Sequence, residues 1–122
     1  MKRVAGMTLC MGLLLNAGCA SLRWGEGYGA VAHAPSTQDW RLRWRVADPQ
    51  RARRQVLADC AVPDCRVVLE FGPGQCGTLA LGSQGRLGVG LGDSPALAET
   101  AALRECQRTD SNCRVAPAEC NR

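Results

Sequence analysis

The chain has 122 residues, 15 of them basic and 11 acidic, and a net charge of +4. Without Lys2 and Arg3, 13 basic residues remain against 11 acidic ones, which is too weakly basic for a dedicated nucleic-acid-binding domain. One Tyr and one Phe also argue against a base-stacking surface, so we expect no nucleic-acid partner.

Residues 1–18 are typical of an export signal. A positively charged start and a short apolar run lead to the small residues Ala17 and Gly18, directly before Cys19. The apolar run is too short for a membrane span, which needs about 20 residues. The signal is therefore expected to be removed, and the remaining chain fits one small domain.

Two cleavages compete at this point. Small residues before a cysteine resemble a bacterial lipobox, in which cleavage leaves Cys19 as a lipidated N-terminus, although Asn16 departs from that pattern. The rival is ordinary cleavage after Ala20. Because Ala20 lacks the acidic character that commonly retains lipoproteins on the inner membrane, we expect a periplasmic protein tethered to the outer membrane through a lipid on Cys19. A secreted protein is the alternative.

After a short tether, residues 19–26, the single domain over residues 27–122 is predicted to be duplicated. The stretch DPQRARRQVLADC, residues 48–60, aligns without a gap with SPALAETAALREC, residues 94–106. Each starts with a good N-cap followed by proline, and its apolar residues recur at helical spacing. Each stretch therefore predicts a capped helix whose buried side ends in a cysteine.

The segments on either side of these helices also repeat, and in the paired stretches apolar residues recur at every second position, as in strands. The matching pairs are GAVA (29–32) with GTLA (77–80), RLRWRVAD (41–48) with RLGVGLGD (86–93), and CRVV (65–68) with CRVA (113–116). In the middle pair one face is apolar in both copies, whereas the other is arginine in the first copy and glycine in the second. We expect another backbone or a large side chain, such as Trp24, Trp40 or Tyr28, to lie close to the glycine face.

These patterns predict an α+β fold. Two tandem strand–strand–helix–strand repeats, about residues 29–74 and 77–120, are expected to form an antiparallel sheet with two helices packed on it and approximate two-fold symmetry. Gly72-Pro73-Gly74 is expected to close a hairpin between the repeats.

Six cysteines follow Cys10 and Cys19, and in an exported small protein an even number indicates disulfides rather than a metal site. The duplication favours the pairs Cys60–Cys65, Cys106–Cys113 and Cys76–Cys120. The rival symmetric scheme is Cys60–Cys106, Cys65–Cys76 and Cys113–Cys120. No metal and no cofactor are expected.

The sequence resembles the family catalogued as domain of unknown function 4189 over roughly residues 24–120. The resemblance rests on the GAVA stretch, the Ala-x-x-x-Ala-Leu-x-x-Cys helix, CRVV, and Phe-x-x-x-x-Cys-Gly. It implies a small exported bacterial protein, often a lipoprotein or secreted, with no established activity. Arg41, Arg43 and Arg45 depart from the aromatic–glycine alternation that members often show.

Catalytic chemistry has few candidates here. His33 is the only histidine, and it lies at the end of a predicted strand with no nucleophile context. Glu70 in VVLEF is expected either on a solvated strand face or as an inward acid. A small envelope hydrolase that uses Glu70 or His33 is therefore the alternative function.

The segment WRLRWR, residues 40–45, is the favoured binding surface. On a regular strand Arg41, Arg43 and Arg45 would line one face about 7 Å apart, beside Trp40. Guanidinium groups bind carboxylates and phosphates, so an envelope protein or an anionic envelope component is the expected partner. The sequence therefore favours an exported, lipid-anchored, non-catalytic binding module, one form of which is a protective inhibitor of an envelope-targeting toxin.

Overall fold

The structure is a computed structural model and describes residues 27–122. The predicted export signal, the tether and Cys19 lie outside these residues. The order strand, strand, helix, strand occurs twice, and we call residues 28–71 the first unit and residues 76–120 the second unit. The elements are β2 (Tyr28–Ala34), β3 (Asp39–Val46), α2 (Pro49–Cys60), β4 (Arg66–Phe71), β5 (Cys76–Leu81), β6 (Leu87–Gly92), α3 (Pro95–Gln107), β7 (Arg114–Val115) and β8 (Glu119–Cys120).

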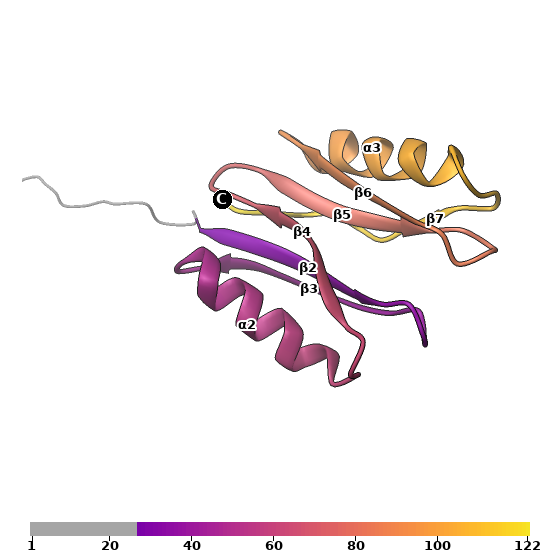
Figure 1. The fold of residues 1–122 in the computed structure, drawn as a ribbon. Coiled ribbons are helices and arrows are strands. Elements are labelled where there is room, and N and C mark those ends of the chain that lie inside the picture. Colours follow the sequence, from indigo (N-terminus) through magenta and orange to yellow (C-terminus); the bar gives the residue numbers. More distant parts are fainter. Residues whose placement is uncertain (1–26) are drawn as a thin grey trace, which may run out of the picture.

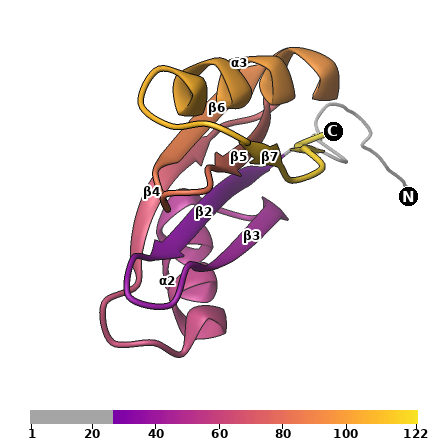
Figure 2. The same cartoon turned by 90° about the vertical axis from the view of Figure 1, so that its right-hand side faces the viewer.

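The elements stack in four layers, namely α2, the first sheet, the second sheet and α3 (Figures 1 and 2). The first sheet has the order β3-β2-β4, and in the second β5 pairs with β6 on one side and with β7 and β8 on the other, all antiparallel. This arrangement confirms the α+β class and the two packed helices. The prediction of one sheet is wrong, because the turn at residues 72–75 carries the chain from one sheet to the other instead of closing a β4–β5 hairpin.

The division into two sheets follows from how the strands distribute apolar side chains. Ala30 and Ala32 in β2 belong to the same buried cluster as Ala52 and Val56 of α2. Val31, between those alanines, belongs to a second cluster, which contains Phe71 and Leu79 and draws on both sheets. Each helix covers only the outer face of its sheet, so the two inner faces bury each other. Apolar burial of this kind is the main stabilising contribution in a domain of this size.

Both helices begin as the sequence predicts. The carboxylate of Asp48 accepts the N–H of Arg51 at 2.8 Å, the hydroxyl of Ser94 accepts the N–H of Leu97 at 3.2 Å, and proline follows each cap. Neither helix among residues 27–122 has the length and apolar character that a bilayer crossing requires.

Three disulfides close the described domain. The bonded pairs are Cys60–Cys65, Cys106–Cys113 and Cys76–Cys120. This connectivity is the favoured prediction, and the rival scheme is wrong. The first two bridges close short helix-to-strand corners, whereas the third joins the start of β5 to the C-terminal β8.

The glycine strand and the arginine strand position their helices differently. Gly88 and Gly90 of β6 face α3, and a Cβ at either position would lie within 3 Å of the backbone of α3. The backbone of α3 is therefore the close neighbour expected on this face, and it packs directly over β6. Gly88 and Gly90 pair with Ala80 and Thr78 of β5, and the equivalent Ala32 and Ala30 of β2 pair with Arg41 and Arg43. The strand pairing therefore matches the glycines with Arg41 and Arg43, two residues away from the match in the sequence alignment. In the first unit α2 lies over both β2 and β3.

Candidate functional site

Trp40 stands at a groove between β3 and the C-terminal segment. Trp40, Leu42 and Trp44 line a hollow of about 570 Å³ together with Pro117 and Glu119. Trp40 also lines a second hollow of about 800 Å³ that runs along residues 112–116. We call these two hollows the Trp40 groove. Concave surfaces lined by aromatic side chains with a few polar groups are the usual form of binding sites.

The groove has a fixed floor and a fixed C-terminal wall. Trp40 and Leu42 pack against the buried cluster between the two sheets. The wall is held by the hydroxyl of Thr78, which donates to the carbonyl of Ala116 at 2.7 Å, and by the N–H of Ala116, which donates to the carbonyl of Leu79 at 3.0 Å. The groove therefore offers a partner an aromatic surface that is ordered before binding.

Charged residues are part of the lining of the first hollow. Asp39, Arg41 and Glu119 line it, so the opening carries charges of both signs. Trp44 is 40% exposed and is the most accessible aromatic side chain of this lining. Tryptophan and arginine are the residue types that most often dominate binding energy at protein interfaces.

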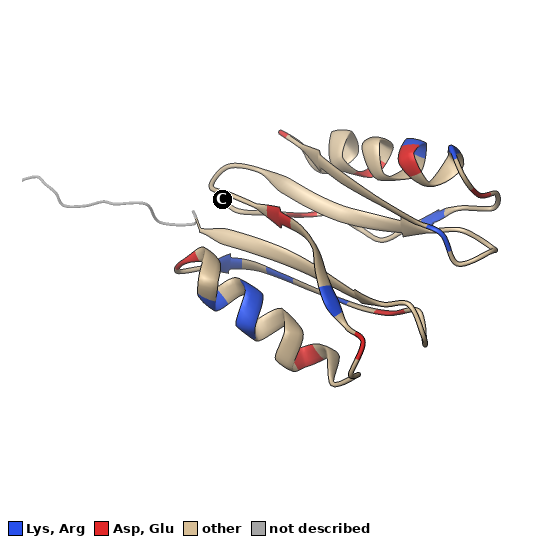
Figure 3. Ribbon diagram, viewed as in Figure 1, with Lys and Arg blue, Asp and Glu red and all other residues tan. Residues whose placement is uncertain are grey.

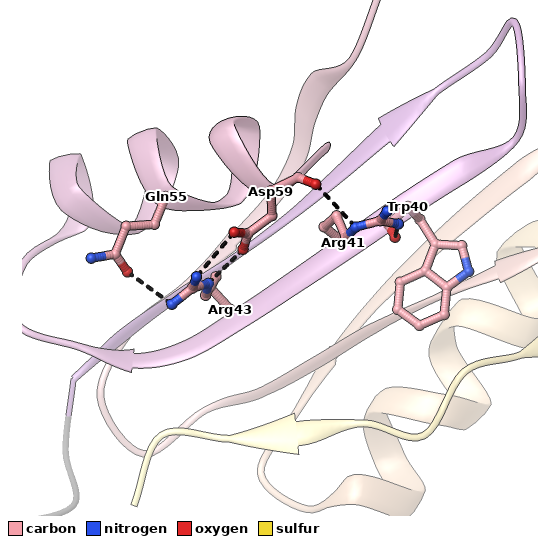
Figure 4. Close-up of polar contacts among 5 residues, drawn as sticks. All are labelled: Trp40, Arg41, Arg43, Gln55 and Asp59. Carbon is pink, nitrogen blue, oxygen red and sulfur yellow. Dashed lines mark hydrogen bonds and ion pairs between the residues drawn. The ribbon is translucent and has the colours of Figure 1, made fainter. Parts of the chain in front are cut away.

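Two of the three predicted binding arginines contact α2 instead of pointing freely into solvent (Figure 4). Arg43 forms an ion pair with Asp59, in which its Nη2 donates to Oδ1 at 3.0 Å, and its Nη1 donates to Gln55 at 3.4 Å. Arg41 donates through Nε to the Asp59 carbonyl at 3.2 Å and through Nη1 to the Trp40 carbonyl at 2.8 Å. α2 has no basic residue in its last turn, so Arg41 satisfies a carbonyl at this helix end from the neighbouring strand.

The ion pair also shifts both ionisation equilibria. Its hydrogen bond and charge raise the pKa of Arg43 and lower the pKa of Asp59, against a smaller opposing effect of burial. Both side chains are partly exposed, so the pair is largely screened by solvent. The main consequence is positional, because the Arg43 charge is already compensated within the domain.

Arg45 leaves the row altogether. The β2–β3 register shifts between Tyr28 and Ala30, and Arg45 has a positive φ of 58°. This bulge adds one residue to β3, so Val46 lies on the face toward α2 and belongs to the buried cluster under that helix. The prediction of three arginines on one regular strand face is therefore wrong, and only Arg41 and Arg43 lie side by side.

The catalytic candidates do not converge. His33 is buried, and its Nε2 lies 3.0 Å from Oε1 of Gln38. Glu70 forms an ion pair with Arg53 of α2 at 3.0 Å, on the outer face of the first sheet. His33 alternates with Ala32, which faces α2, and so belongs to the opposite face of the sheet. The two residues cannot act together on one substrate.

The sequence motifs did not single out two aspartates that occupy equivalent positions in the two units. Each lies within a disulfide-closed corner between a helix and the following strand. Asp64 accepts the N–H and hydroxyl of Ser36, each at 2.8 Å, in the β2–β3 turn. Asp110 accepts the N–H groups of Gln84 at 2.9 Å and Arg86 at 3.1 Å in the β5–β6 turn. These aspartates tie each turn to its corner, and their offset of 46 residues was the signal that could have revealed them.

A further missed residue is Asn121, which is fully buried. Its Oδ1 accepts the N–H of Arg45 at 2.7 Å, and its Nδ2 donates to the carbonyls of Phe71 at 3.1 Å and Gly72 at 3.0 Å. One amide therefore joins the bulge of β3 and the turn between the sheets to the C-terminal end of the chain.

Comparison with known proteins identifies the domain. The family model described as domain of unknown function (DUF4189) matches residues 28–120. The chain belongs to this family. No curated protein and no solved structure matches the chain. The DUF4189 match covers both units, all three disulfides and most of the lining of the Trp40 groove.

Proposed function

We propose that this DUF4189 protein is an exported, non-catalytic binding module of the bacterial cell envelope, held in the periplasm on the outer membrane by a lipid on Cys19. The observation that carries the proposal is the Trp40 groove, a preformed aromatic hollow with a charged rim and a disulfide-closed framework. Disulfides persist in an oxidising compartment such as the periplasm, which supports export.

The partner that fits this groove is an envelope protein. Trp44 offers exposed aromatic area, and Asp39, Arg41 and Glu119 supply charges of both signs around it. A protein surface can match such a mixed rim, whereas a uniformly anionic polymer would be repelled by the two carboxylates. A protective inhibitor of an envelope-targeting toxin is one form of this function.

The state of the catalytic candidates supports binding over hydrolysis. The imidazole of His33 is buried against Gln38, and Glu70 is paired with Arg53. The six cysteines of the described domain are all in disulfides, so none of them offers a free thiol nucleophile.

The decisive experiment compares capture of partners from envelope extracts by the parent chain, Trp44→Ala and Leu57→Ala. Both side chains are similarly exposed, at 40% and 39%, but Leu57 lies on α2 away from the groove. We expect Trp44→Ala to lose the captured protein at least tenfold, as hot-spot aromatics do, and Leu57→Ala to retain it. Equal capture by all three chains would reject the groove as the binding site.

Two companion measurements separate the parts of the proposal. Mass spectrometry of the membrane fraction is expected to find an acylated Cys19, and a soluble species starting at Ser21 would reject the anchor. In a cellular assay, Glu70→Gln is expected to keep the parental effect, and its loss with normal folding would support the hydrolase alternative.

A further inference from the structure

The charges of α2 oppose the dipole of the helix. Arg51, Arg53 and Arg54 lie in its N-terminal half, whereas its last turn holds Asp59 and no basic residue. The N-terminal end of a helix carries partial positive charge, so cations there are unfavourable and anions favourable. By contrast, α3 has Arg104 in its last turn, the favourable arrangement. The charges of α3 follow the preference set by the helix dipole, whereas those of α2 oppose it. A departure of this kind in only one of two equivalent helices suggests that the charges of α2 serve a function other than folding.

Three arginines near this end have no charge partner within the domain. Arg53 is paired with Glu70, and Arg43 with Asp59. Arg45, Arg51 and Arg54 are exposed, and among the described residues their side chains make no hydrogen bond or ion pair. We call these three residues the arginine patch. The nearest acid along the chain, Asp48, is engaged as the N-cap of α2.

The arginine patch lies where the chain enters the domain. A Cβ on Gly27 would lie 2.9 Å from backbone atoms of Arg45, so the first described residue touches the bulge. Pro49 at the start of α2 lines one hollow with Tyr28 and Gly29 at the start of β2. Figure 3 shows the basic half of α2 at the same end of the molecule as the start of β2.

We propose that the arginine patch binds the anionic phospholipid headgroups of the membrane to which the chain is anchored. This proposal rests on the proposed lipid at Cys19. Gly27 follows Cys19 by eight residues of chain, a length that can reach at most about 28 Å, and a random coil of that length has a mean span of about 16 Å. A tether of this length lets the patch come within one Debye length of the headgroups, about 10 Å at 0.1 M salt, where arginines are attracted to an anionic surface.

This contact orients the domain. α2 covers the outer face of the first sheet, whereas Trp40 and Leu42 pack on the inner side of that sheet. With the α2 side on the headgroups, the Trp40 groove stays open to a partner in the periplasm. The membrane contact thus serves the proposed binding function without using the same residues.

The test uses the purified full chain and sedimentation with vesicles of phosphatidylcholine alone or of equal parts phosphatidylcholine and phosphatidylglycerol. The readout is the ratio of partition coefficients on anionic and neutral vesicles, since apolar insertion contributes to both. The patch variant is Arg45→Gln, Arg51→Gln and Arg54→Gln together. The matched control is Arg86→Gln, Arg104→Gln and Arg108→Gln, which removes the same charge from the second unit, where these exposed side chains make no hydrogen bond or ion pair within the described residues.

Each arginine near an anionic surface is expected to change the partition coefficient about fivefold, so the patch variant should lose up to about 100-fold of the ratio and the control less than fivefold. About 0.5 M salt should abolish the parental preference. The melting temperature of the patch variant is expected to equal or exceed that of the parent, because the substitutions remove positive charges from the N-terminal half of α2, where they are unfavourable.

An unchanged ratio in the folded patch variant overturns the proposal. Equal losses in both triple variants overturn it as well, because net charge alone would then explain binding. Retention on purified peptidoglycan without any preference for anionic vesicles would assign the patch to a different anion and reject the lipid. A parental preference for anionic vesicles with no acyl group on Cys19 would support the patch while rejecting the anchor, so the two failures are distinguishable.

Discussion

Replacing Asn121 by alanine is expected to destabilise the whole domain, because one buried amide joins three segments. The change removes the acceptor for the N–H of Arg45 and the donor to the carbonyls of Phe71 and Gly72. Asn121 is fully buried, so these three backbone groups lose their partner away from bulk water.

The size of the effect follows from those three bonds. At about 1 kcal/mol for each bond, Asn121→Ala should lose about 3 kcal/mol of the free energy of unfolding. A small domain has about 5–15 kcal/mol in total, and 3 kcal/mol corresponds to a fall of about 12–24 °C in melting temperature. Urea and thermal unfolding of the oxidised full chain, followed by circular dichroism, measure both quantities. Gln107→Ala, at an exposed position of α3, is the control and should stay within about 0.5 kcal/mol.

Asn121→Asp sharpens the same prediction. Aspartate keeps the acceptor for Arg45 but places a carboxylate against two carbonyl oxygens in a buried site. Burial and these carbonyls should raise the pKa of the new carboxyl group above its usual value of about 3.9. The stability difference from the parent should then be small at pH 4 and grow as the pH rises, because the charged form is penalised only when folded. A loss below about 0.5 kcal/mol in Asn121→Ala, or a pH-independent difference in Asn121→Asp, would refute the reasoning.

Two further predictions test the packing and the corners. Gly90→Ala should lower the free energy of unfolding in urea by about 1–3 kcal/mol, because its Cβ would meet backbone atoms of α3 at less than 3 Å. In the control Gly72→Ala the Cβ meets only the side chain of Gln75, at 3.6 Å, and stability should hardly change. Equal stability of the two variants would contradict the close packing of α3 on β6. Burial of Asp110 opposes its ionisation, but N–H donors from Ser111, Arg86 and Gln84 outweigh it and lower the pKa of Asp110. The folded-state pKa thus lies below the unfolded one, so the carboxylate stabilises the fold above about pH 4 and loses this effect as the pH falls further. Asp110→Asn should flatten the acid limb of the stability profile, and an acid limb as steep as in the parent would contradict this role.

The sequence alone determined the parts that depend on neighbouring residues. Cap, proline and apolar spacing predicted both helices, because these signals act within one or two turns. The duplication predicted the disulfides, because Cys60–Cys65 and Cys106–Cys113 each close a corner of a few residues and leave Cys76 and Cys120 for each other. The DUF4189 resemblance was equally visible in local motifs.

Only the tertiary structure decided how those parts contact one another. Strand periodicity indicated which strand faces are apolar. Whether the strands form one sheet or two depends on what covers those faces, and in this fold the inner faces of the two sheets cover each other. Alternation placed Arg41, Arg43 and Arg45 in one row, yet a one-residue bulge at Arg45, held by Asn121 from the far end of the chain, broke the row. The Trp40 groove likewise forms between residues about 70 positions apart. Such features depend on contacts between distant segments, and the spacing of residues along the chain carries no record of them.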